Sequence, residues 1–519
     1  MATVIGQFFK NIMATYAVMV TGLLIAFFFT PYLIDMLGKE RYGLWTLVFS
    51  IVAYMGLADL GMKQSIVRFV SKHYATKDWK QLNEVISSSA RIYFFVSVII
   101  VAATMTIAFG FVGYFKIPQE FMKTARMVVI VLGFSEAVRY IYLPFTSLGA
   151  FHRFDISGYF QLGTRVIQTL GIIVILEAGL GLVEMAVLIL GLTLVTRIWM
   201  SAIRVRKFPE VHFSRKAINA EKTRELLNYG IYSFLIVATW IVIFQTDNII
   251  IGALLSMEAV AVYSIAGMIV TQIRSSIQVI AIPLVPAISH FEAEKDFARI
   301  MNIYSRAVRY LYYISAYLAI CILTYGGPFI ILWIEKDFTD AISVLHVLII
   351  SSAVFFPQTL ANSVLFGVSK HKVAFYVLIT EAVTKVALSL VLVPYWGIMG
   401  AAWGTAIPQL IIYIFVYPIV FYRVMNFPVK TFYLTSIKSI AASVVFVLPP
   451  AYLMSIILKP DSWLKLIVDC SIVTVLMLTG FSLYILEPDD RKRLIGKLFG
   501  RFMGDYRPEP GDAKEELRD

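Results

Sequence analysis

The sequence predicts an all-α polytopic membrane protein with about fourteen transmembrane helices, built as two parallel six-helix repeats plus a C-terminal helical hairpin. Three observations support this fold class. Apolar residues make up 59% of the 519 residues and charged residues only 15%, too little charge to cover a soluble protein of this length. Apolar runs of about twenty residues recur, enough at about 1.5 Å per residue to cross about 30 Å of hydrocarbon. The chain also resembles itself at a fixed offset.

The apolar runs define the predicted spans in chain order. The first ten residues carry one lysine and no small-residue cleavage site, so we expect an uncleaved first span instead of a signal peptide. Cys321 and Cys470 lie inside predicted spans and indicate neither a disulfide nor a metal site. The fourteen spans are 11–34, 42–62, 92–115, 126–149, 156–177, 182–203, 229–252, 259–283, 308–327, 342–367, 373–393, 398–421, 435–457 and 463–486.

The internal repeat appears as a step of 218 residues, which carries Leu37 to Leu255 and Ser71 to Ser289. Later the step shortens to 216, aligning Gly181 with Gly397, as a two-residue deletion in a turn would produce. An even number of helices per repeat orients both lobes the same way, related by an axis along the membrane normal. Repeats of this kind predict a site between the lobes.

The same pattern divides the chain into five parts. The second lobe follows a polar, basic stretch that we interpret as a cytoplasmic connector. The parts are an N-lobe (1–206), the connector (207–224), a C-lobe (225–424), a two-span hairpin (425–487), and a cytoplasmic basic amphipathic helix with a disordered tail (488–519).

The net charge of +12 is explained by membrane orientation. With the N-terminus in the cytoplasm, about 31 of the 45 Lys and Arg residues fall in loops assigned inside and about seven in loops assigned outside. We therefore expect both termini in the cytoplasm. Nucleic-acid binding does not require such an alternation, so we expect no nucleic-acid partner.

Several short motifs resemble those of a known family. Trp396 stands where that family usually has tyrosine. The segments are 37–45 (LGKERYGLW), 59–61 (DLG) with Arg68 and Ser71, 245–252 (QTDNIIIG) and 397–402 (GIMGAA). Together they resemble the Wzx-type O-antigen and exopolysaccharide flippases of the multidrug/oligosaccharidyl-lipid/polysaccharide (MOP) exporter superfamily, over residues 10–425, and the terminal hairpin is similar to the fourteen-helix branch.

The resemblance implies a transporter in the bacterial inner membrane and not an enzyme. It implies that a lipid-linked oligosaccharide on undecaprenyl pyrophosphate moves from the cytoplasmic to the periplasmic leaflet, as two lobes alternately open a central cavity. Membrane lipids, a polysaccharide polymerase and export proteins are the further partners it implies.

Ionisable side chains within predicted spans are candidate functional residues, because a charge at mid-bilayer costs several kcal/mol unless it faces water or a partner. None of the mid-membrane charges is duplicated at the 218-residue step, whereas a charge needed to build the repeated scaffold should tend to appear in both copies. We expect Arg139, Arg165 and Arg274, helped by Lys385, to hold a pyrophosphate, and Gln161, Gln168, Gln272 and Gln278 to bind sugar hydroxyls. Alternatively, Glu136 with Arg139, and Glu381 with Lys385, have the spacing of pairs within one helix.

No nucleotide-binding motif is present in the sequence, and we expect no cofactor. Coupling to a proton or sodium gradient is therefore the expected energy source, with Asp247, Glu136 and Glu381 as the carboxylates that would carry the ion.

Three other functions compete with that of a polysaccharide flippase. A drug–cation antiporter of the same superfamily usually has twelve helices and a cavity richer in acids. A polysaccharide polymerase or glycosyltransferase needs a sizeable external loop, whereas the longest one here, 328–341, holds only four charged residues. A purely structural scaffold leaves the unduplicated charges unexplained.

Overall fold

The computed structural model describes residues 2–151, 153–281, 284–334, 336–368, 370–487 and 491. All regular elements in these residues are helices, as predicted. The predicted C-terminal amphipathic helix and tail fall, except for Arg491, outside the described residues. The helices before the connector are α1 (Ala2–Met55), α2 (Met62–Ala75), α3 (Trp79–Thr106), α4 (Met122–Ile141), α5 (Leu143–Thr146), α6 (Phe154–Glu177) and α7 (Leu182–Lys207).

The second half of the chain continues the pattern and ends in a helical hairpin. Its helices are α8 (Ala220–Leu254), α9 (Met257–Ala281), α10 (Leu284–Ala293), α11 (Phe297–Ile334), α12 (Asp340–Phe355), α13 (Thr359–Gly367), α14 (His371–Trp396), α15 (Ile398–Ile411), α16 (Tyr417–Met425), α17 (Val429–Ile457) and α18 (Trp463–Gly480). The π-helical turn η9 (Ile412–Val416) joins α15 to α16.

The number of spans agrees with the sequence prediction once α1 is divided. Among the described residues, twelve helical stretches are long and apolar enough to cross a membrane, and the bent pair Gln119–Ile141 and Leu143–Phe151 makes thirteen. One of the twelve, Tyr16–Asp59, contains Gly38 at φ 73° and ψ 167°, which is not a helical conformation. Its 44 residues would extend about 66 Å as one helix, roughly twice the hydrocarbon thickness. Gly38 therefore separates two spans, which brings the total to fourteen.

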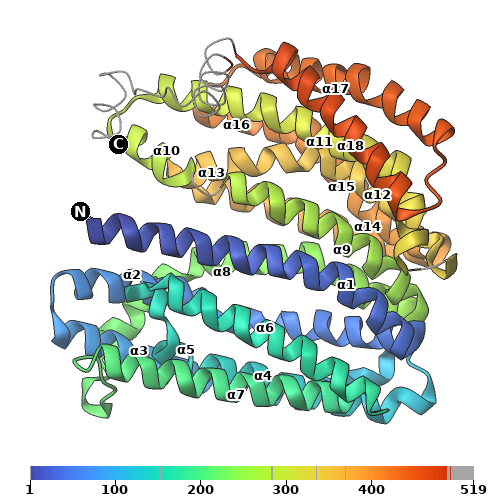
Figure 1. The fold of residues 1–519 in the computed structure, drawn as a ribbon. Helices are drawn as coiled ribbons and strands as arrows, with labels where there is room; N and C mark the ends of the chain where they lie inside the picture. Colours follow the sequence, from blue (N-terminus) through green and yellow to red (C-terminus); the bar gives the residue numbers. More distant parts are fainter. Residues whose placement is uncertain are drawn as a thin grey trace.

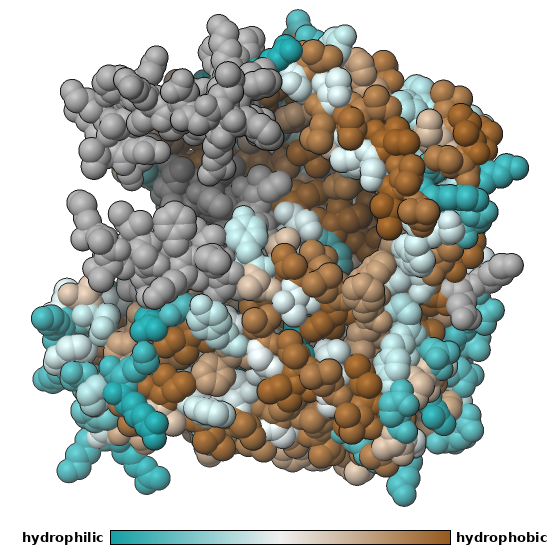
Figure 2. Space-filling view, viewed as in Figure 1, coloured by the Kyte–Doolittle hydropathy of each residue, from teal (hydrophilic) through white to brown (hydrophobic). Residues whose placement is uncertain are grey.

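The helices lie side by side in two groups (Figure 1). Helices α1–α7 form one group and α9–α18 the other. Helix α8 joins them, because it packs on α2 and α3 of the first group and on α14 of the second. Figure 2 shows apolar side chains over most of the visible face, with hydrophilic side chains toward the two ends of the helices. This distribution is that of a protein whose helices cross a bilayer.

The two repeats share local geometry at the predicted step of 218 residues. Lys77 and Lys295 both have positive φ, at 54° and 59°. The next residue caps a helix in each copy, since Asp78 Oδ1 accepts from Gln81 N at 3.1 Å and Asp296 Oδ1 from Arg299 N at 2.9 Å. The hydroxyl of Ser71 also donates to Ala150 O and that of Ser289 to Gly367 O.

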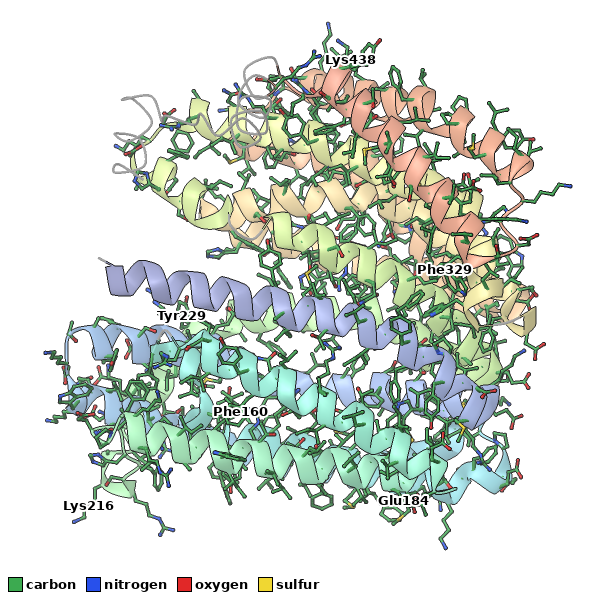
Figure 3. The ribbon with its side chains drawn as sticks, in the orientation of Figure 1. Phe160, Glu184, Lys216, Tyr229, Phe329 and Lys438 are labelled. Carbon is green, nitrogen blue, oxygen red and sulfur yellow. The ribbon has the colours of Figure 1, made fainter. Side chains whose placement is uncertain are left out.

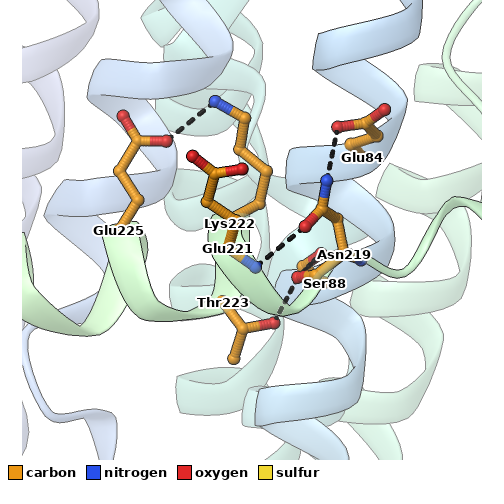
Figure 4. Close-up of polar contacts among 7 residues, drawn as sticks. All are labelled: Glu84, Ser88, Asn219, Glu221, Lys222, Thr223 and Glu225. Carbon is orange, nitrogen blue, oxygen red and sulfur yellow. Dashed lines mark hydrogen bonds and ion pairs between the residues drawn. The ribbon is translucent and has the colours of Figure 1, made fainter.

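The connector is hydrogen-bonded along one face of α3 (Figure 4). His212 N donates to Asn83 Oδ1 at 2.9 Å, and Asn219 N donates to Ser88 Oγ at 3.0 Å. Asn219 also donates to Glu84 at 3.2 Å, and its side-chain oxygen caps α8. The first turns of α8 are thus fixed to the N-lobe. We call this side of the molecule the connector end.

At the other side of the molecule, which we call the opposite end, aromatic rings join the lobes. Phe27 of α1 stacks on Trp333 of α11 with ring centroids 6.0 Å apart, and Trp333 Nε1 donates to Phe27 O at 2.6 Å. Phe329 contacts both rings, Trp463 contacts Phe27 and Phe329, and these four residues form what we call the aromatic cluster. Phe329 lies far from Lys216 of the connector (Figure 3). Toward the connector end, the ribbons of α1 and α10 diverge (Figure 1).

Candidate functional site

A cavity of about 230 Å³ lies in the C-lobe, at its boundary with α1. Its walls come mainly from α8, α9, α12, α14 and α15, and α1 contributes Thr46. Among its lining residues are one acid, Asp247, and two bases, Arg274 and Lys385, so the lining carries a net formal charge of +1. Such a lining favours an anionic ligand. Pockets for drug-sized ligands measure about 300–1,000 Å³, so this cavity has room for a charged group and not for a whole glycan.

Asp247 and Lys385 form a buried ion pair between helices α8 and α14. Lys385 Nζ lies 2.8 Å from Asp247 Oδ2, and the side chains are 2% and 8% exposed. The ammonium also donates to the carbonyl oxygen of Ile243, one turn earlier on α8. Asp247 Oδ2 further accepts from Tyr263 at 2.6 Å and from Thr405 at 3.2 Å. Asp247 Oδ1, by contrast, is buried without a hydrogen-bond partner.

Arg274 is held by aromatic rings on α8. Its guanidinium carbon lies 3.9 Å from the centre of the Phe244 ring and 5.7 Å from that of Trp240. Cations stack favourably on such rings because the ring face is electron-rich. Arg274 Nε is buried without a hydrogen-bond partner. Its charge is therefore available to a ligand in the cavity.

Glu381 lies behind the cavity wall and does not pair with Lys385. Its Oε2 accepts from the hydroxyl of Tyr413 at 2.6 Å, and Glu381 itself is not among the lining residues of the cavity. Lys385 instead pairs with Asp247, on a different helix. The alternative of an intrahelical Glu381–Lys385 pair is thus not what the structure shows.

The N-lobe candidates lie away from this cavity. Arg139 pairs with Glu136 on its own helix at 2.5 Å, which is the arrangement that the intrahelical alternative anticipated. Arg165 of α6 is exposed and lies against α1, where a Cβ added at Gly22 would meet its guanidinium. Arg165 is thus separate from the lining residues of the C-lobe.

The glutamine candidates divide in the same way between the two lobes. Gln272 lines the cavity beside Arg274, whereas Gln278 is half-buried further along α9 and is not a lining residue. Gln161 is exposed and Gln168 half-buried on α6, with Arg165. The structure therefore brings together Asp247, Gln272, Arg274 and Lys385 out of the eleven candidates.

Several polar and aromatic residues at these sites were not predicted from the sequence. Arg197 of α7 lies inside a predicted span and donates to Thr146 at 3.2 Å, so the mid-membrane charge rule could have found it. Trp240 and Phe244 are spaced one helical turn apart, but aromatic residues are too frequent in this chain for that spacing to single them out. Tyr263 and Thr405 come from two other helices, and no local signal connects them to Asp247.

A helical membrane protein with two repeats and a charged cavity inside the bilayer has the architecture of a transporter. Residues 8–292, more than half of the chain, match the family model described as "Polysaccharide biosynthesis protein", and residues 233–391 match the MatE family. The chain belongs to the polysaccharide biosynthesis protein family and is a transporter of the MOP superfamily.

Curated relatives include proteins of two bacteria. The chain is 24% identical over 382 residues to a "Putative O-antigen transporter" of Shigella flexneri, covering 70% of this chain and 86% of that protein. It is 19% identical over 506 residues to the "Uncharacterized membrane protein EpsK" of Bacillus subtilis, covering 96% of this chain and 99% of that protein.

Solved structures share the fold at low identity. The lipid II flippase MurJ in an inward closed conformation has a TM-score of 0.66 at 14% identity, covering 92% of this chain and 98% of its own. An inward-facing multidrug resistance MATE family transporter of the MOP superfamily has a TM-score of 0.60 at 16% identity, covering 77% and 97%. These likenesses establish the architecture.

Proposed function

We propose that the protein flips a lipid-linked oligosaccharide with a pyrophosphate head group across the membrane by alternating access. The observation that carries this proposal is the net positive C-lobe cavity, in which Arg274 has a charge that no acid compensates among the described residues. A pyrophosphate is a concentrated anion, and arginine gives it bidentate, permanently charged donors. The glycan itself would lie in the space between the lobes.

We further propose that the connector end faces the cytoplasm of a bacterial inner membrane. The excess of lysine and arginine in the loops of this end supports the orientation. Membrane lipids, a polysaccharide polymerase and export proteins remain the expected partners, and an ion gradient remains the expected energy source, with no cofactor.

The proposal can be tested in vesicles that contain the full chain and a fluorescent polyprenyl-pyrophosphate glycan. We expect movement of the probe between leaflets, slowed at least tenfold by Arg274→Ala, because losing a charge-assisted bidentate contact costs about 1.5–3 kcal/mol. Arg215→Ala, on the exposed connector, is the matched control and should transport normally. Equal rates for Arg274→Ala and wild type at equal expression would contradict the head-group assignment.

A second candidate is a drug–cation antiporter, which the MatE family match over residues 233–391 favours. Its substrates would be cations, which a cavity lined by two bases and one acid repels. The uptake of a lipophilic cationic dye into the same vesicles, measured by quenching of the dye's fluorescence, distinguishes the two candidates. Arg274→Ala should speed uptake of such a dye if the protein is a drug antiporter, and leave it absent if the protein is a flippase.

A further inference from the structure

Lys385 occupies the place that a coupling cation would take beside Asp247. Its ammonium contacts a carboxylate oxygen and a backbone carbonyl oxygen of α8, and the hydroxyl of Thr405 approaches the same carboxylate. Carboxylate, carbonyl and hydroxyl oxygens are the ligands that hard metal cations prefer. The oxygens that could bind a sodium ion are therefore already occupied by the ammonium of Lys385.

Lys385 is also one of the two positive charges that line the cavity. Its ammonium has three N–H donors, two of which already reach Asp247 Oδ2 and Ile243 O, so a multiply charged anion that binds it competes with Asp247. Glu381, one turn earlier on the same helix, is already hydrogen-bonded by Tyr413 and does not compete for it. Asp247 and the anionic ligand are thus the two groups that compete for the ammonium of Lys385.

We infer that Lys385 is a built-in counter-cation of Asp247 which an anionic head group draws away, and that a proton then neutralises Asp247 in place of a sodium ion. In this exchange the ammonium moves from Asp247 Oδ2 to a phosphate oxygen, and the freed carboxylate takes one proton from a hydronium ion or buffer acid in the surrounding water, whose bond to that proton breaks as the carboxyl O–H bond forms. No other bond forms or breaks. The inference rests on the proposed function and adds to it the ion that accompanies the cargo.

The other charged and titratable groups around Asp247 fit this exchange. Tyr263 of α9 donates to the carboxylate, and Tyr54 of α1 lies near it. Arg274, also on α9, is the nearest further cation in the cavity, and it is held by its aromatic rings on α8. Once Lys385 leaves, no other described residue forms an ion pair with the buried carboxylate, and a buried unpaired charge is costly. Protonation removes that cost.

The first test measures the apparent melting temperature of the full chain in detergent, in sodium chloride and in choline chloride at equal ionic strength. Wild type should melt at the same temperature in both salts. Lys385→Met leaves the oxygens of Asp247, Ile243 and Thr405 free for sodium, so its melting temperature should rise by about 2 °C or more in sodium. The neutral variant Lys385→Met/Asp247→Asn should lose that rise.

A sodium shift in wild type that the neutral variant lacks would overturn the inference. If Lys385→Met does not fold, the comparison of wild type with the neutral variant still tests the inference. The neutral variant should fold, because replacing both partners leaves no buried unpaired charge. The absence of any sodium shift in a folded Lys385→Met would also contradict it.

The second test measures proton uptake when inorganic pyrophosphate binds to the full chain, by calorimetry in two buffers that differ in ionisation enthalpy. Wild type should take up close to one proton more per bound pyrophosphate than the neutral variant. Equal uptake in both would overturn the inference and leave the proposed function standing. No pyrophosphate binding to wild type would overturn the head-group assignment of the proposed function itself.

Discussion

Aromatic rings, and not an acid, position Arg274 in the cavity. Phe244 and Trp240 lie one turn apart on α8, so both rings lie next to the guanidinium. A cation on an aromatic face gains about 0.5–2 kcal/mol while the N–H groups in its plane remain free to donate. This arrangement keeps the charge in place without neutralising it, as a site for a transient anion requires.

Phe244→Leu should therefore weaken pyrophosphate binding without removing a charge. We expect a loss of about 2- to 30-fold in affinity, the equivalent of the cation–π energy, measured by calorimetry on the purified chain. Phe94→Leu, on an exposed part of α3, is the control and should bind normally. An unchanged affinity in Phe244→Leu would mean that Trp240 alone holds the guanidinium.

His73 of α2 gives a pH-dependent contribution to stability outside the membrane spans. Burial and the nearby charge of Lys222 lower the pKa of His73, and its Nε2 has no hydrogen-bond partner. A lowered pKa means that the unfolded chain binds more protons, so folded-state stability falls as the pH drops below about 6.5, the ordinary value for histidine. His73→Gln should lose less stability than wild type between pH 7.5 and 5.5 in denaturant titrations. Parallel losses in the two proteins would contradict this.

The helices could be predicted from the sequence because each span is a long apolar run and its ends carry charge. Repeated pairs such as Lys77 with Asp78, and Lys295 with Asp296, also located matching turns in both lobes. Hydropathy and self-similarity report on one helix at a time. These two signals therefore predicted the helices and the division into two similar lobes.

The pairing of charges across helices could not be predicted in the same way. Lys385 is four residues from Glu381, yet the rotation of α14 against α8 brings it to Asp247. Arg139, by contrast, found the partner on its own helix that spacing suggested. Which outcome prevails depends on helix rotation and crossing, and a single sequence carries no local signal for either.

The repeated caps of α3 and α11 should contribute equally to their two lobes. Asp78→Ala and Asp296→Ala each remove a side-chain acceptor from a backbone N–H near the start of a helix. We expect each change to lower the free energy of unfolding by about 0.5–2 kcal/mol, measured with denaturant in mixed micelles. Because the two sites are far apart, the double variant should show the sum to within about 0.5 kcal/mol. If only one of the two variants lowers the free energy of unfolding, the two caps are equivalent in backbone geometry and not in their contribution to stability.

The two ends of the molecule connect the lobes by different means. At the connector end, hydrogen bonds fix the connector and the first turns of α8 to α3. At the opposite end, the lobes meet through the aromatic cluster with its Trp333–Phe27 hydrogen bond, through a hydrogen bond from Lys39 Nζ to Asp337 O, and through the packing of α1 against α9. Packed aromatic contacts can separate as a unit, whereas the connector is continuous with both lobes. The alternating access that we propose would require the aromatic cluster to open while α8 remains attached to both lobes.

Trp333→Ala should shift the protein toward a form that is open at the opposite end. The change removes the stacking on Phe27 and the hydrogen bond to its carbonyl oxygen, worth together about 1–3 kcal/mol, or roughly a 5- to 150-fold change in the equilibrium between forms. Spin labels at Ala178 and Lys459, on exposed turns of the N-lobe and of the C-terminal hairpin and with both native cysteines replaced, report the separation in vesicles. Longer distances should appear in Trp333→Ala and be rare in wild type. Phe329→Leu keeps both Trp333 contacts to Phe27 and should change the distribution less. Identical distributions in Trp333→Ala and wild type would mean that the cluster does not hold the lobes together, and that the closed end depends on the packing of α1 against α9.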